Sequence, residues 1–238
     1  MSVVPDTTTK ITFKENNSKF NSDGVQFIIN PYDELSLTKA LEIAEITAST
    51  VTVINVGTDT EPVIRKALAI GANDAVRINT APNDAFAVAS EIAQYAKNEN
   101  YDLIFTGRES IDFNGGLVGG LLAEMLAMPL LNIVTKVDIA DGKVTATRDI
   151  DGGKEELSCS LPCVISAQKD LCEPRIPNMR GIMMARSKPL SMLEPTNANA
   201  NADYSSFELP PAKAGVRLID PENAGDLIDI LHNEIKVI

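Results

Sequence analysis

The sequence predicts an α/β protein with a doubly wound, mostly parallel sheet, an antiparallel segment and an extended C-terminal arm ending in a helix. Three observations predict this fold class. Short β-branched runs alternate with helical patterns from residue 34 to residue 128, which is typical of parallel βαβ units. A hairpin signal at Asp141-Gly142 then changes the pattern. Residues 189–212 are rich in Pro, Asn, Ala and Ser, as an extended linker is.

The first part of the chain alternates helix and strand at nearly constant spacing. Asp33 and Thr60 precede two helical patterns and are predicted N-caps, and Gly71 is placed to end the second helix. Parallel strands joined in this way need helices on both faces of the sheet. The apolar periodicity predicts helices over 34–48, 60–71, 83–98 and 117–128, and strands over 50–57, 74–78 and 101–107.

The second part of the chain contains longer β-rich runs. Residues 130–150 hold two such runs around the hairpin signal, and the DGG turn at 151–153 leads into a further run over 154–168. We therefore expect an antiparallel segment to follow the parallel sheet. After the linker, residues 220–238 predict a capped amphipathic helix that closes the chain.

Composition excludes several classes of function. The formal net charge of -12 argues against nucleic-acid binding, because phosphate contacts need clustered positive charge. No apolar run reaches the ~18 residues of a membrane span, and the first residues lack the features of a signal peptide. We therefore expect a cytoplasmic protein without membrane insertion.

The cysteines and the histidine do not indicate a metal or catalytic site. Cys159, Cys163 and Cys172 match neither a CxxC pair nor a zinc pattern, so we interpret them as reduced structural thiols. His232 is the only histidine and lies near the end of the chain. That position makes His-based acid and base catalysis, or a His-rich metal site, a poor explanation of the protein.

Physical chemistry places a candidate ligand site at the carboxyl ends of the parallel strands. Three loops qualify, namely residues 30–33, 55–60 and 107–120. The last loop holds glycines at 115, 116, 119 and 120, which would let backbone N–H groups approach an anion at a helix N-terminus. It fits neither GxGxxG nor the Walker pattern. Nucleotide binding and tight helix packing therefore both remain open explanations of these glycines.

Six motifs carry a resemblance to a known family, and they occur in order over nearly the whole chain. With them the sequence resembles the β subunit of electron-transfer flavoprotein. The motifs are VPDT (4–7), NPYDE (30–34), RKALAIGAND (65–74), GRESID (107–112), RDIDGG (148–153) and RIPNMRGIMMARSK (175–188).

The resemblance implies a heterodimer whose α subunit carries the redox-active FAD, shared at the interface. This chain, by itself not an enzyme, would bind AMP and contain no catalytic residue. Acyl-CoA and related dehydrogenases would deliver electrons, and a membrane electron-transfer flavoprotein quinone oxidoreductase would accept them. The implied cofactor-binding residues are Asn30, Pro31, Tyr32, Asp33, Val56, Thr106, Gly107, Arg108, Ile111, Asp112, Asn114, Gly115, Gly116, Leu117 and Val118.

One loop departs from the family pattern. Bacterial relatives carry a Gly-Asp-Thr-Ala-Gln-Val-Gly run after the Ile-Asp pair, whereas residues 113–119 here read FNGGLVG. An acid and an amide that could bind the nucleotide are therefore absent. In bifurcating relatives a second FAD replaces AMP, and the altered loop argues against that replacement in this chain.

A second function class has to be weighed against the electron carrier. A stand-alone adenine-nucleotide-binding stress protein, or a hydrolase of related fold, would share the α/β sheet. Such a protein would not need the antiparallel segment, the basic Met-rich stretch or the C-terminal arm. A flavin-bearing partner in the purified complex would separate the two classes.

Residues 175–188, called the docking segment below, combine four basic residues with three methionines and no acid. The resemblance implies that this recognition loop docks dehydrogenases, with Met179 as the apolar anchor and basic side chains steering the encounter. The alternative is a Met-rich helix packed into the core with its arginines outside. The implied partner-binding residues of the segment are Arg175, Met179, Arg180, Ile182, Met183 and Arg186, and Lys188 would help to steer the encounter.

The resemblance also predicts how the chain is divided and how it meets its partner. Residues 1–188 would form the nucleotide-binding domain, and residues 189–238 would form an arm and a helix that pack on the α subunit. Asp149 would pair with an arginine of that subunit's mobile flavin domain. The family's first strand, roughly eight residues long before VPDT, has only Ser2, Val3 and Val4 in its place, so we expect that the natural protein begins earlier.

Overall fold

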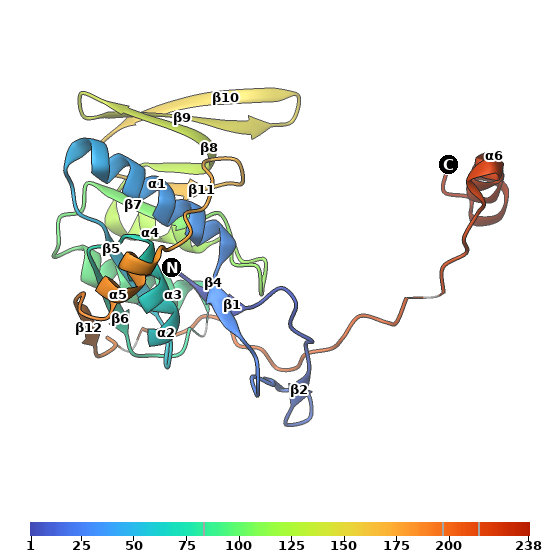
Figure 1. The fold of residues 1–238 in the computed structure, drawn as a ribbon, viewed down its shortest axis with the longest axis horizontal. Coiled ribbons are helices and arrows are strands. Elements are labelled where there is room, and N and C mark those ends of the chain that lie inside the picture. Colours follow the sequence, from blue (N-terminus) through green and yellow to red (C-terminus); the bar gives the residue numbers. More distant parts are fainter. Residues whose placement is uncertain (83, 197, 214) are drawn as a thin grey trace.

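The computed structural model describes residues 1–82, 84–196, 198–213 and 215–238. Its elements follow the predicted alternation, and Figure 1 shows them from the N-terminus in blue to the C-terminus in red. The strands are β1 (Val3–Pro5), β2 (Phe13–Lys14), β3 (Lys19–Phe20), β4 (Phe27–Ile29), β5 (Thr52–Val56), β6 (Asp74–Ile78), β7 (Leu103–Gly107), β8 (Leu130–Ala140), β9 (Lys143–Ile150), β10 (Gly153–Ser160), β11 (Cys163–Ala167) and β12 (Leu190–Leu193). The helices are α1 (Pro31–Thr47), α2 (Glu61–Ile70), α3 (Ala85–Ala96), α4 (Val118–Leu126), α5 (Met179–Ala185) and α6 (Ala224–Asp229), with a 3-10 turn (Pro221–Asn223) and a π-helix (Ile230–Ile235) on either side of α6.

The strands form two main groups. The first is parallel, in the order β12-β6-β5, and the second has the order β10-β9-β8-β11-β7. In the second group β11 runs parallel to both β7 and β8, while β8, β9 and β10 pair antiparallel. The predicted fold class is therefore confirmed. The prediction that the whole 130–168 region is antiparallel was wrong for β11, which returns to the parallel sheet.

Helices cover both faces of the parallel strands, as the alternation predicted. Leu37 and Leu41 of α1 share one buried cluster with Ile64 and Leu68 of α2. On the other face, α3 and α4 pack against β5 and β6 in a separate cluster that contains Ile92. Each face buries its own apolar side chains, which stabilises the fold by roughly 25 cal/mol per Å² removed from water.

Helix boundaries show which local predictions hold. Gly71 ends α2 with φ of 155°, a backbone conformation that favours glycine. Asp33 is not an N-cap, because α1 begins at Pro31 and Asp33 lies in its first turn. Thr60 holds the N-cap position of α2 as predicted, but its hydroxyl accepts no helix N–H and donates instead to Asn55 Oδ1 at 2.6 Å. Asp84 caps α3 by accepting from the Ala87 N–H.

Some predictions concern residues outside the described ranges. These are residue 83, the predicted first residue of the third helix, and residues 197 and 214 of the predicted arm. Within the described residues, the predicted linker contains a strand, since β12 pairs with the edge of β6. This strand was not predicted, because a run of four residues without apolar alternation gives no strand signal. The terminal helix is present, but its described residues pass from a 3-10 turn through α6 into a π-helix.

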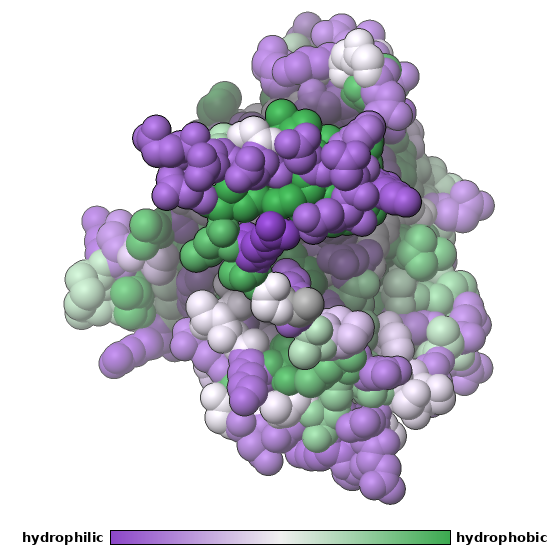
Figure 2. Space-filling model, turned by 90° about the vertical axis from the view of Figure 1, so that its right-hand side faces the viewer, coloured by the Kyte–Doolittle hydropathy of each residue, from purple (hydrophilic) through white to green (hydrophobic). Residues whose placement is uncertain are grey.

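Two parts project from the body in Figure 1. The hairpin of β9 and β10 extends beyond the helices, and the arm runs past β2 to place α6 far from the sheet. Figure 2 views the side from which the arm projects and shows apolar side chains exposed among polar ones. Val216 and Leu218 of the arm are 86% and 90% exposed. No helix in the described part of the chain is long and apolar enough to cross a membrane.

Candidate functional site: a pocket at the carboxyl ends of the strands

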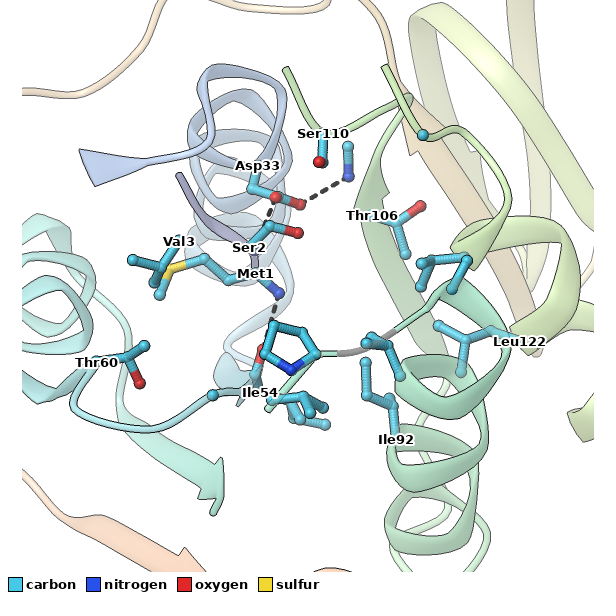
Figure 3. A pocket seen from close by; sticks show the side chains of 18 of the residues that line it. Met1, Ser2, Val3, Asp33, Ile54, Thr60, Ile92, Thr106, Ser110 and Leu122 are labelled. Carbon is cyan, nitrogen blue, oxygen red and sulfur yellow. Dashed lines mark hydrogen bonds between the residues drawn. The ribbon is translucent and has the colours of Figure 1, made fainter. Parts of the chain in front are cut away.

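A cavity of about 720 Å³ lies where β5 and β7 lead into α2 and α4. Its volume falls within the roughly 300–1,000 Å³ of small-molecule pockets. Figure 3 shows Ile54 and Thr60 on one side of the cavity and Thr106 and Leu122 on the other. The site therefore lies where the parallel topology predicted it.

The loop after β7 is fixed by two buried side chains from the start of α1. The Asp33 carboxylate accepts the N–H groups of Ser2 and Gly107, each at 2.9 Å, and the Asn30 amide at 3.0 Å. Asn30 also donates to Glu109 O at 2.8 Å and accepts the Ile111 N–H at 3.2 Å. These bonds hold the loop beside the cavity. Asn30 and Asp33 thus shape the site, and most of their hydrogen-bonding groups are already paired within the protein.

Glycines allow the loop and α4 to approach β7 closely. A Cβ on Gly119 would lie 2.8 Å from Thr106 Oγ1, and one on Gly107 would lie 2.7 Å from the Tyr32 Cβ. Tight packing, one of the two open explanations, therefore holds for these two positions. Gly115 has open space around it and lines the cavity together with Gly116. The first N–H groups of α4 lack intrahelical acceptors, so an anion could bind at this helix start.

The Thr106 hydroxyl oxygen is buried without a hydrogen-bond partner among the described residues. A buried hydroxyl in this state costs free energy, by about 1–3 kcal/mol in mutational data. The cavity wall between β7 and α4 therefore contains a hydroxyl group with which the described residues form no hydrogen bond.

The predicted cofactor-binding residues divide into two sets. One set lines the cavity: Asp33, Val56, Thr106, Gly107, Arg108, Asp112, Gly115, Gly116 and Val118. The other set is absent from its lining: Asn30, Pro31, Tyr32, Ile111, Asn114 and Leu117. Tyr32 instead lies under the Arg108 guanidinium, 5.7 Å from ring centroid to Cζ. The assignment of either set to a nucleotide stays a prediction.

Several cavity residues were not predicted from the sequence. Met1, Ile92, Tyr101 and Tyr204 come from the chain start, α3, the residue pair before β7 and the C-terminal arm. Burial raises the pKa of the Tyr101 phenol, with its hydrogen bond to Tyr95 as the second cause. No motif marks these residues, because they meet only through the tertiary fold.

The docking segment is a short helix whose apolar side chains face solvent. Met179 and Met183 are 74% and 69% exposed, and Ile182 and Met184 are more than 40% exposed. Ala185 is the buried residue of α5. The alternative of a Met-rich helix packed into the core is therefore wrong for these side chains. The helix begins only after Pro177 and Asn178, and Asn178 caps it by accepting the Gly181 N–H at 2.8 Å.

The basic residues of the docking segment play two different parts. Arg175 makes two hydrogen bonds to the Glu45 carboxylate, at 2.6 and 2.8 Å, and this contact lowers the pKa of Glu45. The Lys188 ammonium donates to carbonyls at the end of α2, including Leu68 O at 2.9 Å, and burial lowers its pKa. These two residues fix the segment on α1 and α2. Arg180 and Arg186 are exposed.

Asp149 lies on the projecting hairpin, near the end of β9. Its side chain is 63% exposed, and one carboxylate oxygen lies 3.9 Å from Lys154 Nζ. An exposed pair at this distance contributes less than about 1 kcal/mol. The carboxylate is therefore accessible to a partner, and its predicted contact with the α subunit stays a prediction.

The sheet and the cavity define a class, namely α/β proteins whose ligand site lies at the carboxyl ends of parallel strands. No group of acidic, cysteine or histidine side chains able to hold a metal ion occurs among the described residues. Residues 18–198 match the family model described as "Electron transfer flavoprotein domain". The chain belongs to the electron transfer flavoprotein family, as a β subunit.

Similar proteins cover almost the whole chain. A protein of Syntrophomonas wolfei named electron transfer flavoprotein subunit beta is 39% identical over 239 residues, covering 98% of this chain and 94% of its own length. The protein of the same name from Bacillus subtilis is 34% identical over 248 residues, covering 98% and 96%. That of Dictyostelium discoideum is 32% identical over 228 residues, covering 92% and 91%.

Proposed function

We propose that this chain is the nucleotide-binding and docking subunit of a heterodimeric electron carrier, in which an α subunit bears the redox-active FAD. Electrons would pass from acyl-CoA and related dehydrogenases to that flavin, and from it to a membrane quinone oxidoreductase. The FAD would supply the redox chemistry, and this chain would bind a nucleotide and dock the partner proteins. The observation that carries the proposal is the cavity, in a chain that belongs to this family over almost its full length.

The cavity suits AMP in size and chemistry. Apolar side chains such as Ile54, Ile92 and Leu122 would pack on the base, and Gly115 and Gly116 would let phosphate oxygens approach the backbone. Because the loop is held from behind by Asn30 and Asp33, the site is formed before the ligand enters. A second FAD in place of AMP is the less suitable ligand, since residues 113–118 lack the acid and the amide of the family run.

The docking segment is the surface we assign to dehydrogenases. Flexible, polarizable methionines suit surfaces that fit several partners, and two exposed arginines would steer an acidic partner. The arm exposes apolar side chains that would be buried on the α subunit, and Asp149 would pair with an arginine of its flavin domain. We assign the complex to the cytoplasm, with no catalytic residue in this chain.

The test is to express the chain with its α subunit, purify the complex and identify the nucleotides released on denaturation by mass. We expect one FAD and one AMP per heterodimer. Two FAD molecules would show that the β site holds a second flavin. A nucleotide-bound homodimer without a flavin-bearing partner would support the stand-alone nucleotide-binding protein instead.

A further inference from the structure

Four aromatic rings from three distant parts of the chain form a continuous stack, called the aromatic ladder below. Phe13 stacks on Phe207 with centroids 5.3 Å apart, and Phe207 stacks on Tyr204 at 5.6 Å. Tyr204 stacks in turn on Phe113 at 4.8 Å. The ladder thus joins the hairpin of β2 and β3, the C-terminal arm and the loop before α4.

Phe113 and Tyr204, at one end of the ladder, line the cavity, whereas Phe13 and Phe207 do not. Phe113 is 53% exposed and Tyr204 is 49% exposed. Large aromatic side chains are half-exposed here even though they stack on each other. Their remaining apolar area faces the cavity and solvent, so a ligand in the cavity would bury more of it.

The arm is held in this position by contacts that do not depend on the rings. The Asp84 carboxylate accepts the N–H groups of Asn201 and Ala202, at 2.6 and 2.9 Å. The hydrogen bond from the Ala87 N–H is the main cause that lowers the pKa of Asp84, and the N–H groups of Asn201 and Ala202 lower it further. The Phe207 N–H donates to Asn17 O at 2.7 Å. The backbone on both sides of Tyr204 is therefore fixed, which places its ring at the cavity.

We propose that Tyr204, carried by the C-terminal arm and stacked on Phe113, is a wall of the nucleotide site and holds the bound nucleotide in place. This inference rests on the proposed function, because it takes the ligand to be an adenine nucleotide. Aromatic faces bind bases and exclude water without requiring a particular hydrogen bond. The site is then built from two parts of the chain, the α/β sheet and the arm.

The inference gives the arm a second role. The same arm carries exposed apolar residues farther along, and these are the residues we assign to the α subunit. Movement of residues 201–207 would open the cavity wall. Retention of the nucleotide should therefore depend on the arm and not only on the loops at the strand ends.

The experiment measures how fast AMP leaves the full-length chain in complex with its α subunit. The complex is loaded with labelled AMP and diluted into an excess of unlabelled AMP. Tyr204→Ala should release AMP roughly tenfold faster, the change that about 1.4 kcal/mol of lost contact produces. Tyr204→Phe keeps the ring and should release AMP at the wild-type rate. Ile46→Ala truncates an exposed apolar residue of α1 outside the ladder and should also leave the rate unchanged.

Two outcomes overturn the inference while the proposed function stands. One is AMP release from Tyr204→Ala at the rate of Ile46→Ala. The other is equal acceleration in Tyr204→Phe and Tyr204→Ala, which would assign the effect to the hydroxyl and not to the ring. If the wild-type complex retains no adenine nucleotide, both the proposed ligand and this inference fail.

Discussion

Truncation of Met179 to alanine tests whether this side chain is a docking anchor or part of the core. Full burial of a Met side chain contributes about 1.5–3 kcal/mol. Met179 is 74% exposed, so only about a quarter of that contribution belongs to the fold. Met179→Ala should therefore lower the free energy of unfolding by roughly 0.5 kcal/mol, whereas a core Met→Ala change costs about 2–5 kcal/mol.

The expected effect on docking is much larger than the effect on folding. Loss of an interface anchor costs about 2 kcal/mol or more, which is roughly 30-fold in affinity. The assay is the rate of flavin reduction by a limiting acyl-CoA dehydrogenase, measured as a function of the concentration of the complex. Met179→Ala should need a correspondingly higher concentration for half-maximal rate. Its flavin spectrum and nucleotide content should not change.

Met192→Ala is the matched control, because Met192 is 58% exposed but lies on β12 and outside the docking segment. The flavin of the Met192→Ala complex should be reduced at the wild-type rate. The free energy of unfolding in urea should change by a similarly small amount. The reasoning is refuted if Met179→Ala is reduced like Met192→Ala by every dehydrogenase tried. It is also refuted if urea denaturation of Met179→Ala shows the loss typical of a core truncation.

Three further predictions follow from single side chains. Asp149→Ala should change the domain populations seen by X-ray scattering and the reduction kinetics of the complex, with less than about 1 kcal/mol of stability lost; unchanged scattering and kinetics would remove its assignment to the α subunit. Lys188→Met should lower the free energy of unfolding by about 1–3 kcal/mol in urea, because the carbonyls at the end of α2 lose their donor; a neutral result would show that water replaces the ammonium. Burial, with Cys159 nearby, raises the pKa of the Cys163 thiol from its ordinary 9.0 to about 12, so its contribution to stability should be full below pH 9.0 and be lost as pH rises toward about 12. Iodoacetamide at pH 8 should accordingly label Cys159 before Cys163, and equal labelling of the native protein, read by peptide mass, would contradict this.

Local signals predicted the α/β alternation well because each signal acts over a few residues. A glycine just past an apolar periodic stretch ends a helix wherever the helix packs, and Gly71 does so. The N-cap prediction failed for Asp33, and Thr60 holds the N-cap position without a side-chain cap hydrogen bond. The Asp33 carboxylate accepts hydrogen bonds from Ser2 and Gly107, which are too distant in the sequence for a local pattern to reveal. The Thr60 hydroxyl donates to Asn55.

The site was predicted in part for the same reason. Topology places ligand sites at the carboxyl ends of parallel strands, so the loops at 55–60 and 107–120 could be identified. The contribution of Tyr204 to the cavity wall could not be predicted, because it depends on the contacts of the arm with Asp84 and Phe113. β12 was missed because LSML is short and adjoins a Pro-rich segment. Its strand conformation comes from pairing with β6.

The docking segment shows why composition is an incomplete guide to a basic patch. Four basic side chains in a chain of net charge -12 suggested a surface that attracts acidic partners. In the structure, Arg175 is bound to Glu45, and Lys188 is held by the carbonyls of α2. A third contact comes from Arg65, which donates to Ala185 O and Lys188 O at 2.9 Å each. Both ends of α5 are therefore fixed, so less conformational entropy would be lost if the exposed methionines bound a partner, as we propose. Arg175 and Lys188 hold the segment in place, so only Arg180 and Arg186 would be available for the proposed encounter.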